Sequence, residues 1–124
     1  MNHLVHKHLI VRAEIDKCPD NPEWVHEWLV HLVDVIGMSI LSGPHVARED
    51  EVVGNIGCTG VVVIKTSHVC IHLWEETGLM QLDIYTCGPL FIDDIWPLLD
   101  CMSPTKIEWK YLDREHGLVL EMES

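Results

Sequence analysis

Apolar and polar residues alternate over several short stretches of this chain, and this pattern predicts a β-sheet. Leu9–Ile15 places charged Arg12 and Glu14 between apolar neighbours, as a half-buried strand does. Three more runs have the length and the β-branched content of strands: Gly60–Lys65, Val69–Trp74 and Leu79–Tyr85. Because only Glu75–Gly78 separates the last two, we expect antiparallel neighbours joined by a tight turn.

A helix is predicted directly after the first strand. Asn21 offers an N-cap oxygen, Pro22 suits the first helical position, and Gly37 marks the end. Between them, the apolar side chains recur at helical spacing and form one wide stripe: Trp24, Val25, Trp28, Leu29, Leu32, Val33 and Ile36. Such a stripe is buried when the helix covers a sheet.

The segment after this helix is harder to interpret. Met38–Ser42 has the composition of a short strand, and we expect Gly43-Pro44 to break it. The stretch Arg48–Gly60 is polar and contains three glycines, which predicts a loop.

The last third of the chain predicts a second short helix and a final strand. Asp93 is placed to cap this helix, Pro97 falls in its first turn, and Lys106–Leu112 alternates as a strand. The order of elements predicts one α+β domain over residues 1–124, a two-layer sandwich with helices on one face of a mainly antiparallel sheet. The other face then needs a cover, and a partner subunit is a plausible one.

Charge limits the partners of the protein. Twenty Asp and Glu residues against eight Lys and Arg give a net charge of −12, which repels phosphate backbones and anionic lipids. We therefore expect no nucleic-acid or membrane partner. The negative charge either favours a cationic small-molecule substrate or only keeps the surface soluble. The longest aliphatic run, Val61–Ile64, is too short to cross a bilayer, so a cytoplasmic protein is expected.

The five cysteines are odd in number and include no CxxC pair. This pattern argues against a disulfide framework and against a structural zinc site, so no metal is expected. A histidine and cysteine metal-binding protein is the weakest functional hypothesis, since only His68, Cys70 and His72 lie close together in the sequence.

One predicted strand pair and its flanks carry most of the reactive side chains. These are Thr66, Ser67, His68, Cys70, His72, Glu75, Glu76, Asp83 and Cys87. Residues two apart on a strand share a face, so Cys70 and His72 point the same way. The turn at Glu75–Gly78 returns the chain and brings the Asp83–Cys87 end towards Ser67. We therefore expect a hydroxyl, an imidazole, a carboxylate and a thiol to converge.

Residues 59–88 also have a distinctive order. It includes Gly60-Val61-Val62-Val63-Ile64, Ser67-His68, Ile71-His72, Trp74, Glu76, Asp83 and Tyr85-Thr86-Cys87-Gly88. This order resembles the short bacterial and archaeal class of S-adenosylmethionine decarboxylase. That family reads approximately G-V-V-V-I-x-E-S-H-x-x-I-H-T-W-P-E, with a D-x-[FY]-T-C-G segment at the separation found here.

The resemblance implies a self-processing enzyme. In the family, a serine hydroxyl attacks the carbonyl of the preceding residue to form an ester. A β-elimination then cuts the chain and leaves the serine as a pyruvoyl group. By position, Ser67 is this serine and the bond that breaks is Thr66–Ser67. His72 matches the processing histidine, and Thr59 matches a serine that acts as a hydrogen-bond donor.

The resemblance also implies a cofactor, a substrate and an assembly. The pyruvoyl group made from Ser67 reacts with the α-amine of S-adenosylmethionine and accepts the electrons released as CO2 leaves, which supplies the aminopropyl donor for spermidine synthesis. Cys87 matches the proton donor, and Glu76 matches the carboxylate that holds the ribose hydroxyls. The paired sandwiches of the family, together with the uncovered sheet face, predict a homodimer.

Two positions depart from the family pattern and leave alternatives open. Thr66 stands where the family usually has glutamate, and Val53 stands where a phenylalanine stacks on adenine. Trp74 is the nearest ring that offers a replacement, although it is also typical of a core residue. One alternative is a pyruvoyl-dependent decarboxylase of ornithine or arginine, which explains Val53. Another is a non-processing regulatory relative, which explains Thr66.

Overall fold

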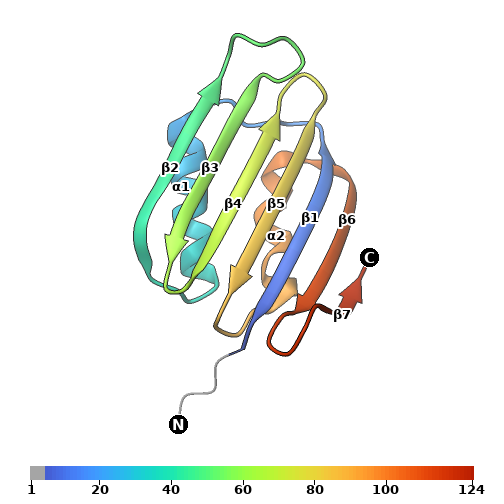
Figure 1. Ribbon diagram of the computed structural model, residues 1–124. Helices are drawn as coiled ribbons and strands as arrows, with labels where there is room; N and C mark the ends of the chain where they lie inside the picture. Colours follow the sequence, from blue (N-terminus) through green and yellow to red (C-terminus); the bar gives the residue numbers. More distant parts are fainter. Residues whose placement is uncertain (1–4) are drawn as a thin grey trace.

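The computed structural model describes residues 5–124, and it has a seven-stranded antiparallel sheet with helices on one face (Figure 1). The strands are β1 (Lys7–Ile15), β2 (Ile40–Glu49), β3 (Gly57–Ile64), β4 (Ser67–Trp74), β5 (Leu79–Thr86), β6 (Pro104–Asp113) and β7 (Val119–Glu123). Their order across the sheet is β2-β3-β4-β5-β1-β6-β7, so β1 lies between β5 and β6. The predicted two-layer α+β sandwich is confirmed.

The longer helix, α1 (Pro22–Val35), forms where the sequence predicts it. The Asn21 side chain accepts a hydrogen bond of 2.8 Å from the backbone N–H of Glu23, which satisfies a free donor of the first turn. The apolar stripe of α1 lies on the sheet, with Val25, Leu29 and Leu32 fully buried. This helix covers β2 and β3 (Figure 1).

The shorter helix, α2 (Trp96–Leu99), lies between two 3-10 turns at Ile92–Asp94 and Asp100–Met102. It covers the other half of the same face, behind β5 and β1 (Figure 1). The indole N–H of Trp28 in α1 donates to the carbonyl of Leu98 at 3.0 Å, which ties the two helices together. The predicted cap at Asp93 is wrong, because this residue lies within the first 3-10 turn and α2 begins later without a side-chain cap.

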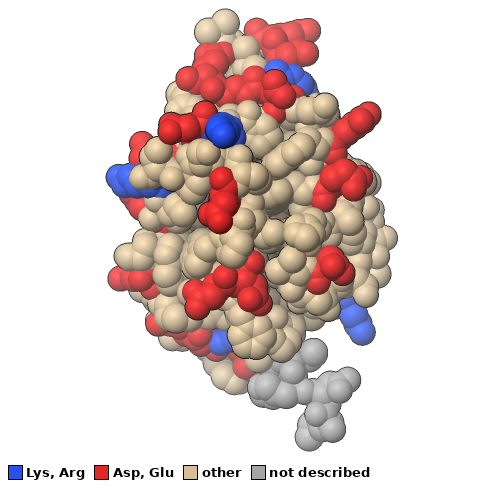
Figure 2. Space-filling model, turned by 180° about the vertical axis from the view of Figure 1, so that it is seen from behind, with Lys and Arg blue, Asp and Glu red and all other residues tan. Residues whose placement is uncertain are grey.

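The two faces of the sheet differ in chemistry. Alternate residues of β1, β4 and β5 point into the core beneath the helices, among them Val11, Ile71 and Ile84. The residues between them form the open face, which carries no helix from residues 5–124. Figure 2 shows the helix-covered side of the molecule, where acidic side chains clearly outnumber basic ones. In the described part of the chain, no helix is long and apolar enough to cross a membrane.

Two expectations about the strands were wrong. Gly43-Pro44 does not break a strand, because β2 continues past it to Glu49 and accommodates it by shifts in its pairing with β3. The predicted loop Arg48–Gly60 is therefore shorter, since β3 begins at Gly57. Backbone pairing with a neighbouring strand outweighs the local preference of glycine and polar residues for loops. The edge strand β7 was not predicted.

Candidate active site

The turn between β3 and β4 holds an unusual residue. Ile64 and Ser67 are paired, so Lys65 and Thr66 alone make the turn. Thr66 has a φ of 48°, in the left-handed region that a β-branched side chain rarely adopts. Such a conformation costs on the order of 1–3 kcal/mol and persists only where the surroundings impose it. The bond between Thr66 and Ser67 therefore follows a strained residue.

Ser67 is held firmly at the start of β4. Its side chain lies on the helix side of the sheet, with Val69 and Ile71, and the residue is only 8% exposed. Its hydroxyl oxygen accepts a hydrogen bond of 2.9 Å from the backbone N–H of Cys87. This bond joins the start of β4 to the residue that follows β5, as the hairpin prediction requires.

The Cys87 thiol completes this group. The Thr66 hydroxyl lies 2.9 Å from the Cys87 sulfur and is placed to donate to it, while the thiol lies 3.2 Å from the Lys65 carbonyl. The hydrogen bond from Thr66 lowers the pKa of Cys87, and a bond to Ser67 adds to this effect against the opposing effect of burial. The sequence thus correctly placed the hydroxyl and the thiol together.

The imidazole of His72 lies elsewhere. His72 is five residues along β4 from Ser67, which is about 17 Å on an extended strand. An odd separation also turns its side chain to the open face, away from Ser67. The expected convergence of His72 and Asp83 with Ser67 is therefore wrong within one chain, because both side chains belong to the open face.

His72 has its own set of partners on the open face. Its Nδ1 lies 3.1 Å from the Thr59 hydroxyl, and its Nε2 lies 3.3 Å from the Cys70 sulfur. Thr59 of β3 is the direct partner of His72 in β4, and this pairing brings the Thr59 hydroxyl to the His72 ring. The prediction that Cys70 and His72 share a face is confirmed.

A groove of about 210 Å³ lies at this end of β4. Its lining includes Thr59, His72, Asn55 and Trp74. The Trp74 indole N–H donates to the Asn55 side chain at 3.0 Å, and its ring lies 6.0 Å from that of His72. Trp74 is thus a half-buried wall of a groove rather than a core residue. Asn55 had not been singled out, because nothing in its local sequence indicates this contact.

Glu76 lies beside the loop that precedes β3. One of its carboxylate oxygens accepts a hydrogen bond of 2.8 Å from the backbone N–H of Gly54. The neighbouring Val53 is 86% exposed on the same loop. Glu75, which precedes Glu76, is paired instead with Arg48 of β2. Val53, where the family has phenylalanine, is therefore next in the chain to the residue that the Glu76 carboxylate binds.

Comparison with known proteins settles the relationship that these residues suggested. Residues 7–115 match the S-adenosylmethionine decarboxylase family. The chain belongs to this family. The resemblance drawn from residues 59–88 is thereby confirmed, and it extends over most of the chain.

Two S-adenosylmethionine decarboxylase proenzymes illustrate the similarity. The one from Persephonella marina is 33% identical over 110 residues, which cover 82% of this chain and 74% of the relative. The one from Thermoplasma acidophilum is 43% identical over 60 residues. That second match covers 47% of this chain and only about half of the relative, at 46%.

The fold agrees with a solved member of the S-adenosylmethionine decarboxylase family. The crystal structure of the adenosylmethionine decarboxylase from Aquifex aeolicus superposes with a TM-score of 0.73 at 27% identity. The match covers 99% of this chain and 98% of the other. The whole described fold is therefore that of the family.

Proposed function

We propose that this protein is a self-processing, pyruvoyl-dependent decarboxylase of S-adenosylmethionine that supplies the aminopropyl donor for spermidine synthesis. The observation that carries the proposal is the group formed by Ser67, Thr66 and Cys87, at the turn where the family cuts its chain. A buried hydroxyl, a strained preceding residue and a thiol meet there.

The local geometry suits the cleavage reaction. The Ser67 oxygen forms a bond to the carbonyl carbon of Thr66, and the bond from that carbon to the Ser67 nitrogen breaks, which gives an ester. Removal of the Ser67 α-proton then expels the Thr66 carboxylate, which cuts the chain and leaves a dehydroalanine at position 67. Water hydrolyses the imine tautomer of this residue, which releases ammonia and leaves the pyruvoyl ketone. Strain at Thr66 favours the first of these steps, because breaking the peptide releases the left-handed conformation.

The surroundings of Ser67 also fit the pyruvoyl group that the family forms. That group supplies an electron sink for the pair released as CO2 leaves. The position is shielded from water, as Ser67 is buried, and the backbone N–H of Cys87 points at its oxygen. Cys87 delivers a proton to the carbon that has lost CO2, and a thiol is a suitable acid near neutral pH.

The groove near His72 offers a binding surface for the rest of the substrate. Trp74 presents an aromatic wall, and Glu76 has one carboxylate oxygen without a bond to Gly54. Aromatic stacking and a carboxylate for two hydroxyls suit an adenosine. The net charge of −12 further favours the sulfonium cation.

These two groups lie at opposite ends of β4, so we propose that the enzyme is a homodimer that shares its sites. Within one chain His72 is about 17 Å from Ser67 and faces away from it. A second copy packed against the open face, with its strands reversed, brings its own His72 and Thr59 to the exposed Thr66 of the first. Such a two-fold arrangement forms two equal sites. A cytoplasmic location stays a prediction from the shortness of the apolar runs in the sequence.

Release of labelled CO2 tests the proposed function. We expect release from S-adenosylmethionine but not from ornithine or arginine, and none from the Ser67→Ala variant, which has no nucleophile. Ser39→Ala, which changes an exposed serine, is the matched control and retains activity. Release from ornithine or arginine alone, or normal activity of Ser67→Ala, contradicts the proposal.

A further inference from the structure

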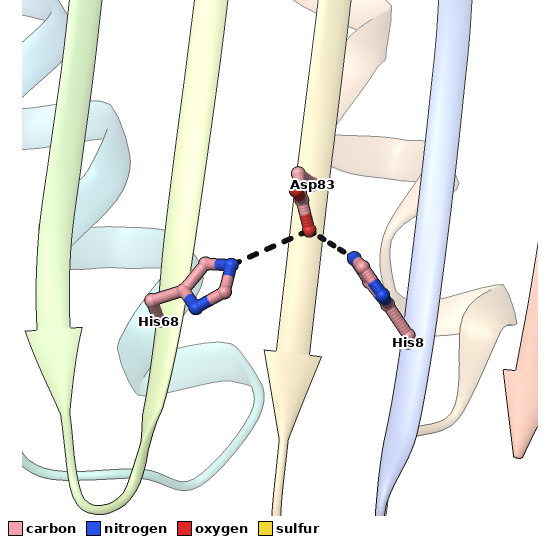
Figure 3. A group of neighbouring side chains, drawn as sticks. All are labelled: His8, His68 and Asp83. Atoms are coloured by element: carbon pink, nitrogen blue, oxygen red, sulfur yellow. Dashed lines mark hydrogen bonds and ion pairs between the residues drawn. The ribbon is translucent and has the colours of Figure 1, made fainter. Parts of the chain in front are cut away.

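A second cluster of reactive side chains lies on the open face and takes no part in the function proposed above. It consists of His8 of β1, His68 of β4 and Asp83 of β5, with Asp83 between the two rings (Figure 3). These residues are far apart in the sequence but belong to three adjacent strands. Both histidines are paired with Tyr85, and Asp83 is two residues from Tyr85 on the same face.

The three side chains converge closely enough to hold one ion. His8 Nε2 contacts the Oδ1 atom of Asp83, and His68 Nε2 lies 3.6 Å from the same oxygen. One ligand atom from each residue lies within 4.8 Å of the others. In a tetrahedral site with bonds of 2.0–2.1 Å, ligand atoms are about 3.3 Å apart. A small rotation of the rings is therefore enough.

The sheet also preorganises these three side chains. All three side chains are half-buried and come from paired strands rather than from loops, so little freedom is lost on binding. They come from a single chain, so one chain supplies all three ligands, although they lie on the open face against which the proposed second copy packs. The net charge of −12 raises the local concentration of cations.

We propose that His8, His68 and Asp83 bind a divalent transition-metal ion. Two imidazole nitrogens and one carboxylate oxygen form a donor set for Zn2+, Co2+, Ni2+ or Fe2+, with positions left for water. Mg2+ and Ca2+ fit poorly, because they prefer oxygen ligands. The sequence predicted no metal because its criterion was spacing along the chain, and these ligands are assembled by strand pairing.

Arg114 competes with the ion. Its guanidinium lies 3.2 Å from His8 Nδ1 and donates to it, so this nitrogen carries the lone pair and Nε2 carries the proton directed at Asp83. Binding through Nε2 moves the proton of the ring to Nδ1, where it meets a second donor. Arg114 is held there by Tyr85, with its charged carbon 4.4 Å from the ring centre. Removal of Arg114 should therefore tighten binding.

Metal titration of the purified, metal-free full chain tests the site. Calorimetry with Zn2+ and visible absorption with Co2+ should each give one strong site per chain. We expect His68→Ala and Asp83→Asn to weaken binding by tenfold or more, and Arg114→Gln to strengthen it severalfold. Because Arg114→Gln predicts a gain, misfolding cannot mimic its effect.

Two controls separate this site from other ligands. His31→Ala changes an exposed histidine of α1, and Cys70→Ser removes the nearest thiol on the open face. Both should leave the affinity unchanged. The proposal is wrong if no ion binds, if Cys70→Ser abolishes binding, if His68→Ala binds like the wild type, or if Arg114→Gln does not bind more tightly.

Discussion

Thr66 combines three features that bear on the proposed cleavage. It occupies a left-handed conformation, precedes the proposed nucleophile Ser67, and places its hydroxyl 2.9 Å from the Cys87 sulfur. The family usually has a charged glutamate here. Threonine supplies a hydrogen-bond donor to the thiol, which a charged carboxylate cannot do, and it adds β-branching. Strain and hydrogen bonding therefore both act beside the bond that we propose is cut.

The hydrogen bond from Thr66 predicts a pH effect on Cys87. The donor favours the thiolate and lowers the pKa of Cys87, so its removal should raise that pKa. In the uncut Ser67→Ala protein, adding Thr66→Val should shift the alkylation of Cys87 to higher pH. Iodoacetamide rates, followed by peptide mass, measure the shift. Thr105→Val, which changes a distant hydroxyl, should not move the profile, and an unmoved profile for Thr66→Val contradicts the assignment.

Val53 predicts a change in substrate affinity. It is exposed on the loop that Glu76 holds through Gly54, and it replaces the ring that stacks on adenine in the family. Val53→Phe should lower the KM for S-adenosylmethionine by up to about tenfold, with little change in kcat. Val52→Phe, at the neighbouring exposed position, is the control. Equal effects of both substitutions, or none, show that the loop does not contact the substrate.

The family could be predicted from residues 59–88 because the order of residues there is specific. Ser67 and Cys87 could be placed together from the hairpin alone. The position of His72 could not be predicted in the same way, because convergence was inferred from nearness in the chain. Residues an odd number of positions apart on a strand, such as Ser67 and His72, point to opposite faces. The cluster of His8, His68 and Asp83 also escaped notice, since β1 reaches β5 only through the topology of the sheet.

At the scale of elements, the packing of α1 on β3 positions the hairpin that carries Ser67. Gly60 lets the helix approach, because a Cβ there would lie 2.7 Å from a methyl carbon of Leu29. Gly60→Ala should destabilise the fold by about 1–3 kcal/mol through overpacking. Urea denaturation measures this change. If the contact is the cause, Leu29→Ala should offset part of the loss in the double variant, whereas purely additive effects argue against it.

Most helices and strands could be predicted because the pattern of apolar residues in each reflects which side of it is buried. The strands β1, β4 and β5 each have one buried face, so they alternate clearly, and α1 has both a cap and a stripe. The edge strand β7 has only five residues and is exposed along its whole length, so it has no buried face to mark it as a strand. The predicted strand ended too early, at Ser42, because Gly43 and Pro44 locally disfavour a strand. Local preference does not reveal that the residues beyond them pair with β3.

At the scale of the whole molecule, the two halves of the proposed site predict a shared dimer. Ser67→Ala and His72→Ala should each be inactive, but their coexpression should restore about a quarter of wild-type activity, because half the dimers are mixed and each has one complete site. Decarboxylation assays on the purified mixture measure this, and light scattering should report two chains. A monomer, or a mixture as inactive as its components, contradicts the shared site.

If Ser67 cuts the chain that contains it, the intact mass of the purified protein under denaturing conditions reveals the two products. We predict two fragments, residues 1–66 and a fragment from residue 67 onwards whose first residue is a pyruvoyl group and therefore resists Edman degradation. Ser67→Ala should give a single species. A single mass of about 14.2 kDa for the wild type after prolonged incubation contradicts self-processing.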